Sequence, residues 1–342
     1  MSQNRSGCFT AILVVTLLVS AVLNVAFLLP RATRSVKAGG RGAKSQGSPF
    51  GEQVVKPATH GHEDSENRVA VIYIRGVISS ATPGQVEESG LEDTLAEIEQ
   101  ARTDETIKSV LLRIDSPGGE VTASDILYKA VCKLRDKKPV VVSMDSVAAS
   151  GGYYVACGGS HLFAHETTIT ASIGVIMQTL NYRELLGKVG VDVLTFKSGA
   201  MKDLLNGARE LTEEERAYVQ GMINQSYDRF VGIVAKERHL NEATLRSGIA
   251  DGRIVSGEDA VRAKLVDDLG GFDEALEKAR MLGNVPGGAA IRYTAPLAFG
   301  RLIRMLSETS FKNAKVEVDL GGKLQGKLQN GRLYYLPAVL VP

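Results

Sequence analysis

The chain has 342 residues, with 40 Lys+Arg against 39 Asp+Glu and a net charge of +1. Hydrophobic residues make up 44% and charged residues 23%, which excludes collagen-like, coiled-coil and wholly disordered proteins. The near-neutral charge argues against a nucleic-acid partner, because counterion release needs a basic surplus. The three cysteines form no C-x-x-C pattern, so we expect neither a disulfide scaffold nor a zinc site.

The first element in chain order is an apolar N-terminal segment. No charged residue lies between Arg5 and Arg31, and residues 9–29 are almost entirely apolar. About 20 such residues at 1.5 Å each span a bilayer core of roughly 30 Å, and no A-x-A cleavage site follows. The pattern predicts an uncleaved single-pass membrane anchor over residues 1–30. Residues 31–67, rich in Gly, Ser, Lys and Pro, are expected to form a flexible linker.

The charges that flank the anchor bear on its orientation. Five basic residues follow the apolar segment, whereas Arg5 and the amino terminus precede it. The positive-inside rule taken alone would place the large C-terminal part in the cytoplasm.

Strand and helix patterns alternate along the rest of the chain. Short β-branched runs predict strands over residues 69–78, 110–114, 139–144, 161–164, 169–177 and 191–196. Helical spacing of apolar residues predicts helices over residues 91–102, 121–134, 182–188, 258–264 and 272–281. This alternation predicts an α/β fold with a mostly parallel sheet. We expect one folded domain over residues 68–288 and a C-terminal tail over residues 289–342.

A long helix is expected over residues 212–239. Thr212 and Glu215 have the spacing of a capping box at its start. Its apolar residues cover more than one stripe, more than a helix buried on a single face requires. Two interpretations remain open here: the helix contacts another copy of the chain, or it lies between two layers of its own subunit.

Two glycine-rich segments, residues 115–119 and 148–152, each follow a predicted strand and precede a helix. Backbone N–H groups at such a junction suit an anion, either a phosphate or a tetrahedral oxyanion. Neither segment has a dinucleotide-binding or P-loop pattern, so the sequence predicts no nucleotide and no other cofactor. The alternative is two tight turns with no ligand.

Ser150 lies in the second glycine-rich segment between small residues, and it is either a helix cap or a nucleophile. A nucleophile needs a base, and the folded part offers three histidines, His161, His165 and His239, without a G-x-S-x-G elbow. Lys202 is the other option. Free lysine has a pKa of about 10.4, and burial in a dry site brings an amine into the working range of a base.

Four motifs in order resemble the signal peptide peptidase A family of Ser–Lys serine peptidases. They are Asp115-Ser116-Pro117-Gly118-Gly119, Ala148-Ala149-Ser150-Gly151-Gly152, Ala171-Ser172-Ile173-Gly174 and Lys197-Ser198-Gly199-Ala200-Met201-Lys202-Asp203. The resemblance covers about residues 69–279 and includes Ala250-Asp251-Gly252-Arg253. It implies a Clp/crotonase-type fold of stacked ββα units. It also implies Ser150 as nucleophile, Lys202 as general base, Gly119 and Gly151 as the oxyanion hole, and Ser172 as the residue that positions the lysine.

The resemblance further implies an endopeptidase that degrades released signal peptides and similar apolar, unfolded peptides. It places the catalytic domain outside the cytoplasm, whereas the charges that flank the apolar segment would place it inside. Because the chain carries one copy of the domain, it resembles the short, single-domain form of the family. Because longer members carry two copies of the domain, we expect a homo-oligomer, a closed ring in which one copy's Lys202 serves another's Ser150. A crotonase-fold acyl-thioester enzyme and an inactive membrane scaffold remain as alternatives.

Overall fold

The computed structural model describes residues 50–59, 61, 66–80, 90–294 and 334–335. The chain separates into two compact units, residues 1–47 and 48–342, and every described residue belongs to the second. The predicted anchor lies outside the described residues. Among the helices that are described, none is both long and apolar enough to cross a membrane.

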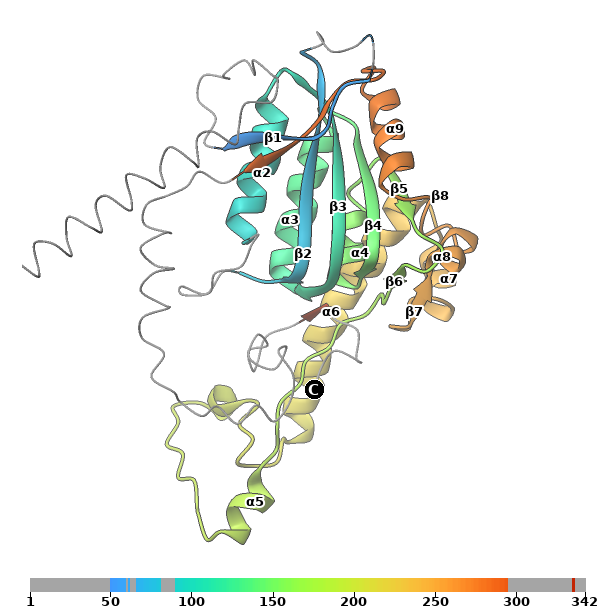
Figure 1. Cartoon of the computed structure of the whole chain (residues 1–342). Helices are drawn as coiled ribbons and strands as arrows, with labels where there is room; N and C mark the ends of the chain where they lie inside the picture. Colours follow the sequence, from blue (N-terminus) through green and yellow to red (C-terminus); the bar gives the residue numbers. More distant parts are fainter. Residues whose placement is uncertain (1–49, 60, 62–65, 81–89, 295–333, 336–342) are drawn as a thin grey trace, which may run out of the picture. The chain divides into compact units, whose positions relative to one another are not determined.

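A mostly parallel sheet forms the centre of this unit (Figure 1). Its main path runs in the order β1 (Gly51–Lys56), β9 (Ala290–Thr294), β2 (Arg68–Ile78), β3 (Ile107–Glu120), β4 (Val140–Ala149), β5 (His161–Ala164) and β8 (Asp268–Leu269). Three strands lie off this path: β6 (Ile169–Ala171) pairs with β4 and β7 (Ile254–Ser256), and β10 (Tyr334–Tyr335) pairs with β3. Within the described sheet, only the β1–β9, β6–β7 and β3–β10 pairs are antiparallel. The predicted α/β fold with a mostly parallel sheet is confirmed.

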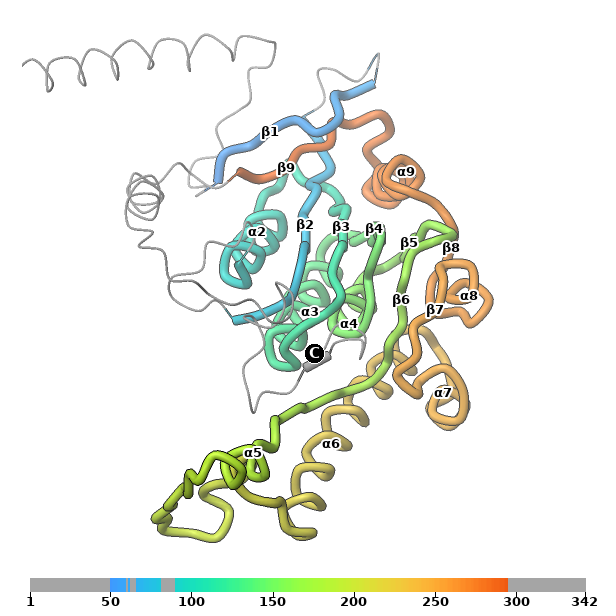
Figure 2. The backbone as a smooth tube through the Cα atoms, turned by 60° about the horizontal axis from the view of Figure 1, so that its bottom comes forward, coloured from blue at the N-terminus to red at the C-terminus, as the bar shows by residue number. Residues whose placement is uncertain are grey.

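Helices cover both faces of the sheet (Figures 1 and 2). The helices α2 (Leu91–Thr103), α3 (Val121–Arg135) and α4 (Gly151–Ala156) pack on one face, and α9 (Phe272–Leu282) packs on the other. Along β2, Ala70 and Ile72 belong to the first core, whereas Val69 and Val71 face α9. A strand buried on both faces reads as a continuous apolar run, which explains the composition of residues 69–72.

Several boundaries differ from the sequence-based expectation. The expected linker contains β1, and the expected tail contributes β9, which lies between β1 and β2. The turn expected at residues 115–119 is the end of β3, because this segment pairs with β2 and β4. The strand expected over residues 191–196 is wrong: no ladder forms there, and Phe196 is 94% exposed.

Residues 178–229 form an arm that extends from the sheet and its covering helices (Figure 2). It holds α5 (Arg183–Lys188), the 3-10 helix η1 (Ala200–Asp203) and the first part of α6 (Glu213–Arg238). The predicted capping box at Thr212 is present. Beyond the arm, the end of α6 joins the core from Phe230 onward, before α7 (Glu242–Ser247) and α8 (Gly257–Arg262). Most of the first half of α6 is exposed, so only the last part of the helix, from Phe230, is buried in the core of its own subunit.

Candidate active site

Ser150 stands at the junction between β4 and α4. Its φ and ψ are 53° and −115°, a conformation that is strained for any residue with a side chain. The backbone is held there because Ser150 N donates to the carbonyl oxygen of Ala171 at 2.7 Å and Tyr154 N donates to Ser150 O at 2.8 Å. The side chain is fully buried, and its Oγ has no hydrogen-bond partner within the described part of the chain. A strained, unpartnered hydroxyl of this kind is a candidate nucleophile.

The two predicted oxyanion-hole glycines lie next to one another. A Cβ atom on Gly151 would stand 3.0 Å from the backbone nitrogen of Gly119. A Cβ on Gly119 would stand 1.9 Å from the carbonyl oxygen of Ile78, so only glycine fits there. Close approach of β2 and β3 thus explains the glycine at 119, and the structure brings both segments to the side of Ser150.

Ser172 is tied to the same junction through Ala171. Ser172 has a φ of 52°, and its amide donates to Arg253 O at 2.9 Å. Its Oγ donates to Gly252 O at 3.3 Å. The turn at residues 251–253 therefore holds Ser172 in place. The Ala250-Asp251-Gly252-Arg253 motif by itself did not indicate that role. No sequence signal short of β6–β7 pairing could have revealed it.

Lys202 is not brought to Ser150. It is exposed in η1, and the described residues offer its amine no hydrogen bond or ion pair. The neighbouring Asp203 accepts from Arg209 at 2.7 Å, and Arg209 also donates to Glu215 at 2.8 Å, which fixes η1 to the start of α6. The hydrogen bonds from Arg209 lower the pKa of Glu215 to about 2.

The length of α6 separates Lys202 from the core. Phe230 is the first α6 residue in the core beyond this network, and its ring lies 5.0 Å from that of Tyr154 in α4. Between Glu215 and Phe230 the helix rises about 22 Å, at 1.5 Å per residue. That is more than one lysine side chain spans.

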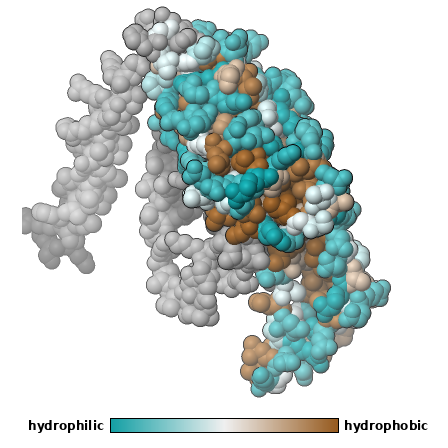
Figure 3. Space-filling view, turned by 90° about the vertical axis from the view of Figure 1, so that its right-hand side faces the viewer, coloured by the Kyte–Doolittle hydropathy of each residue, from teal (hydrophilic) through white to brown (hydrophobic). Residues whose placement is uncertain are grey.

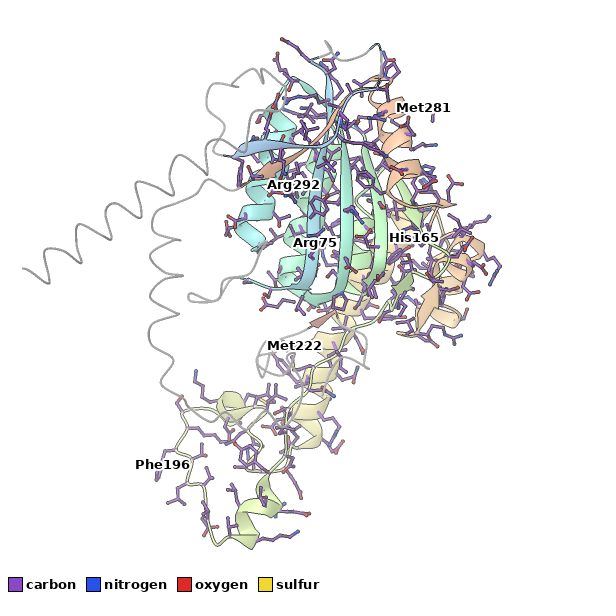
Figure 4. The ribbon with its side chains drawn as sticks, in the orientation of Figure 1. Arg75, His165, Phe196, Met222, Met281 and Arg292 are labelled. Atoms are coloured by element: carbon purple, nitrogen blue, oxygen red, sulfur yellow. The ribbon has the colours of Figure 1, made fainter. Side chains whose placement is uncertain are left out.

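The histidines form no catalytic triad with Ser150. His161 Nε2 lies 2.7 Å from Asp268 Oδ2. His165 is exposed at the end of β5 (Figure 4). His239 is the left-handed C-cap of α6. Because Ser150 Oγ has no partner in the described residues, none of the three is its base there.

Strand β10 adds to β3 beside these glycines. Its Tyr335 is paired with Gly119 and its Tyr334 with Glu120, in antiparallel register. The edge next to Ser150 can therefore receive an extended main chain. Across the described residues, no three His, Cys, Asp or Glu side chains gather as a metal site would require.

Comparison with known proteins identifies the family. The model of Peptidase family S49 matches residues 132–286, and the model of Clp protease matches residues 67–175. An Enterococcus faecium protein provisionally named signal peptide peptidase SppA is 34% identical over 248 residues, 71% of this chain and 72% of that protein. The chain belongs to peptidase family S49. This membership confirms the enzyme class that the motifs implied, a serine peptidase, over an acyl-thioester enzyme.

Other relatives are matched over part of their length. A Methanocaldococcus jannaschii protein provisionally named a protease is 43% identical over 197 residues, 57% of this chain and 63% of that protein. Protease 4 of Haemophilus influenzae is 33% identical over 233 residues, 68% of this chain and 37% of that protein. The chain thus corresponds to little more than a third of that longer relative.

Proposed function

We propose that this S49 peptidase is a membrane-anchored endopeptidase in which Ser150 attacks the peptide carbonyl and Lys202 of a second copy is the general base. The separation between the two residues carries this proposal. Ser150 is buried and its Oγ has no partner in the described structure. Lys202 is exposed in η1, which Arg209 ties to the start of α6, and about 22 Å of helix lies between Glu215 there and Phe230 in the core. A base that cannot reach its own subunit's nucleophile can serve a neighbouring subunit.

The proposed reaction proceeds through an acyl-enzyme. Lys202 takes the Ser150 proton, and Ser150 Oγ bonds to the carbonyl carbon. The N–H groups of Gly119 and Gly151 stabilise the resulting oxyanion. Lys202 then gives the proton to the leaving amine and later activates the water that hydrolyses the ester. Ser172 is proposed to hold the amine of the incoming Lys202. Its hydroxyl lies close to the nucleophile, because the preceding residue, Ala171, accepts a hydrogen bond from the Ser150 amide.

The surface of the arm supports assembly of several copies. The lower part of Figure 3 shows apolar side chains on the outside of the arm, and Figure 4 labels Phe196 and Met222 there. The most exposed apolar side chains are Leu180 at 72%, Leu194 at 82% and Phe196 at 94%. An exposed apolar surface favours a protein interface. We propose a closed ring, because a repeated interface between identical subunits closes by symmetry.

Extended, apolar peptides are the proposed substrates. β10 pairs with Gly119 and Glu120, and we propose that a substrate main chain displaces β10 and pairs with the same two residues of β3. An apolar segment at residues 9–29 would anchor the enzyme where signal peptides are released into the membrane. We propose that the catalytic domain lies outside the cytoplasm, because a protease that cleaves unfolded peptides would degrade nascent chains if it faced the cytoplasm. The charges that flank the apolar segment favour the opposite orientation.

The test combines two inactive variants of the full chain. Ser150→Ala and Lys202→Ala are each expected to lose peptidase activity, because nucleophile and base act as one unit. After the two are dissociated and reassembled together, sites with Ser150 from one copy and Lys202 from another should restore about a quarter of wild-type activity. A fluorophosphonate probe should label these sites at Ser150.

Two outcomes would contradict the proposal. If hetero-oligomers form and the mixture stays inactive, the dyad is not shared between copies. If wild-type protein is not labelled at Ser150 at all, the chain is an inactive scaffold.

A further inference from the structure

A second buried serine lies beside the candidate site. Ser124 belongs to the first turns of α3, its side chain is fully buried, and its Oγ has no hydrogen-bond partner among the described residues. A buried hydroxyl without a partner destabilises a folded protein, because it has given up its hydrogen bonds to water. The reaction proposed above gives Ser124 no role, so this hydroxyl requires an explanation.

Ser124 and Gly119 converge on one position beside Ser150. Ser124 Oγ lies 2.5 Å from the point where a Cβ atom on Gly151 would stand, and Gly119 N lies 3.0 Å from the same point. Glycine at 151 leaves this space open, and any side chain there would press against the Ser124 hydroxyl. Two potential donors thus face the residue that directly follows Ser150.

We propose that Ser124 is a third donor of the oxyanion hole, with its hydroxyl bonding to the substrate oxygen that becomes negative when Ser150 attacks. The inference rests on the proposed function, since it needs Ser150 as nucleophile. A serine O–H rotates about its Cβ–Oγ bond and can turn toward a new acceptor. Donors fixed where charge develops favour the transition state, and a hydroxyl left free in the resting enzyme gives up no other bond.

The fold supplies a matched control for this proposal. Ser143 in β4 is also fully buried, and its Oγ likewise has no hydrogen-bond partner in the described part. Its neighbour two residues earlier, Val141, faces α9, so Ser143 lies on the sheet face opposite α3 and α4. Removing either hydroxyl removes one unsatisfied buried group, and only Ser124 adjoins the candidate site.

The experiment compares Ser124→Ala and Ser143→Ala in the full chain. Turnover of a peptide substrate gives kcat and KM, and a peptide aldehyde, which forms a tetrahedral adduct with the serine, gives an inhibition constant. Ser124→Ala should lower kcat by ~10- to 100-fold with little change in KM, and it should raise the inhibition constant of the peptide aldehyde. Neither variant should have a lower Tm, since each loses an unsatisfied hydroxyl. Ser143→Ala should retain wild-type kcat.

A third variant, Ser124→Cys, keeps a side chain of similar size with a weaker donor, and its kcat should lie between those of the serine and alanine proteins.

The proposal is overturned if Ser124→Ala keeps wild-type kcat and aldehyde affinity. It is also overturned if both alanine variants lose the same activity, or if the loss follows a fall in Tm. Should Ser150→Ala remain active, the proposed function itself fails. If Ser150 is labelled and essential but Ser124→Ala is unaffected, only this inference fails.

Discussion

The amide of Ser150 donates a 2.7 Å hydrogen bond to the carbonyl oxygen of Ala171, and both residues have positive φ, 53° and 62°. Ser172 follows with a φ of 52°. Each such residue costs roughly 1–3 kcal/mol, so the strain is concentrated around Ser150, the proposed nucleophile, and Ser172, the residue proposed to position the lysine. Pairing of β6 with β4 on one side and β7 on the other holds this geometry.

The first prediction concerns the Ser172 hydroxyl. Ser172→Ala should move the acid limb of the pH–rate profile to higher pH, because the neutral amine of the base loses a hydrogen-bond partner. Ser172→Gly should shift the profile equally but raise Tm relative to alanine, since glycine adopts a φ of 52° without strain. Steady-state kinetics between pH 6 and pH 10 and a thermal melt measure both; an unchanged profile would remove Ser172 from the site.

The second prediction concerns the arm. Arg209→Ala should lower activity at least about tenfold while leaving the Tm of the core unchanged, because Arg209 fixes η1 and Lys202 to α6 through Asp203 and Glu215. Arg216→Ala is the control: its only ion pair in the described chain, with Glu213, is exposed and 3.7 Å long. Equal kinetics for the two variants would show that the network does not position Lys202.

The third prediction concerns Glu97 in α2. Burial is the main cause that raises the pKa of Glu97 to about 7, and the nearby charge of Asp93 adds to it. The folded-state pKa of Glu97 lies above the unfolded value of 4.5, so the folded protein favours the protonated carboxyl. Its stability is therefore fully present below pH 4.5, where Glu97 is protonated in both states, and falls as the pH rises through 7, where the buried carboxylate ionises. Glu97→Gln should therefore stabilise the protein at pH 8 by up to roughly 3 kcal/mol and change little at pH 4.

Urea unfolding of this variant at both pH values measures the difference. Glu99→Gln is the control, because Glu99 is exposed and its hydrogen bond from Arg102 lowers its pKa. A gain in stability at pH 4 equal to that at pH 8 would show that ionisation of Glu97 is not the cause.

The fourth prediction concerns the N-terminal segment. Deletion of residues 1–45 should give a soluble, active peptidase, because the sheet and the candidate site are built from residue 50 onward. Fractionation of cells should find the full chain with the membrane and the truncated chain in the soluble fraction. An insoluble or inactive truncated protein would show that the N-terminal segment belongs to the fold.

The sequence alone determined the class of fold and the local form of the site. An apolar side chain favours burial whatever its neighbours in space, so the pattern of apolar residues along the chain predicted β2, β4 and the helices that cover them. The glycines at 119 and 151 were recognised from their motifs, and the structure gives the reason: backbone and Ser124 atoms stand where their side chains would lie. Family membership then followed from the order of the motifs.

Only the tertiary structure decided which residues meet. Strand pairing brings the turn at 251–253 to Ser172, and it extends β3 through a Pro-Gly-Gly segment that reads locally as a turn. The run at 191–196 has the composition of a strand, yet no partner strand lies beside it, so it stays exposed on the arm. Distances between residues far apart in sequence depend on the path of the whole chain. That path, along α6, sets Lys202 apart from Ser150 although their motifs lie within one domain.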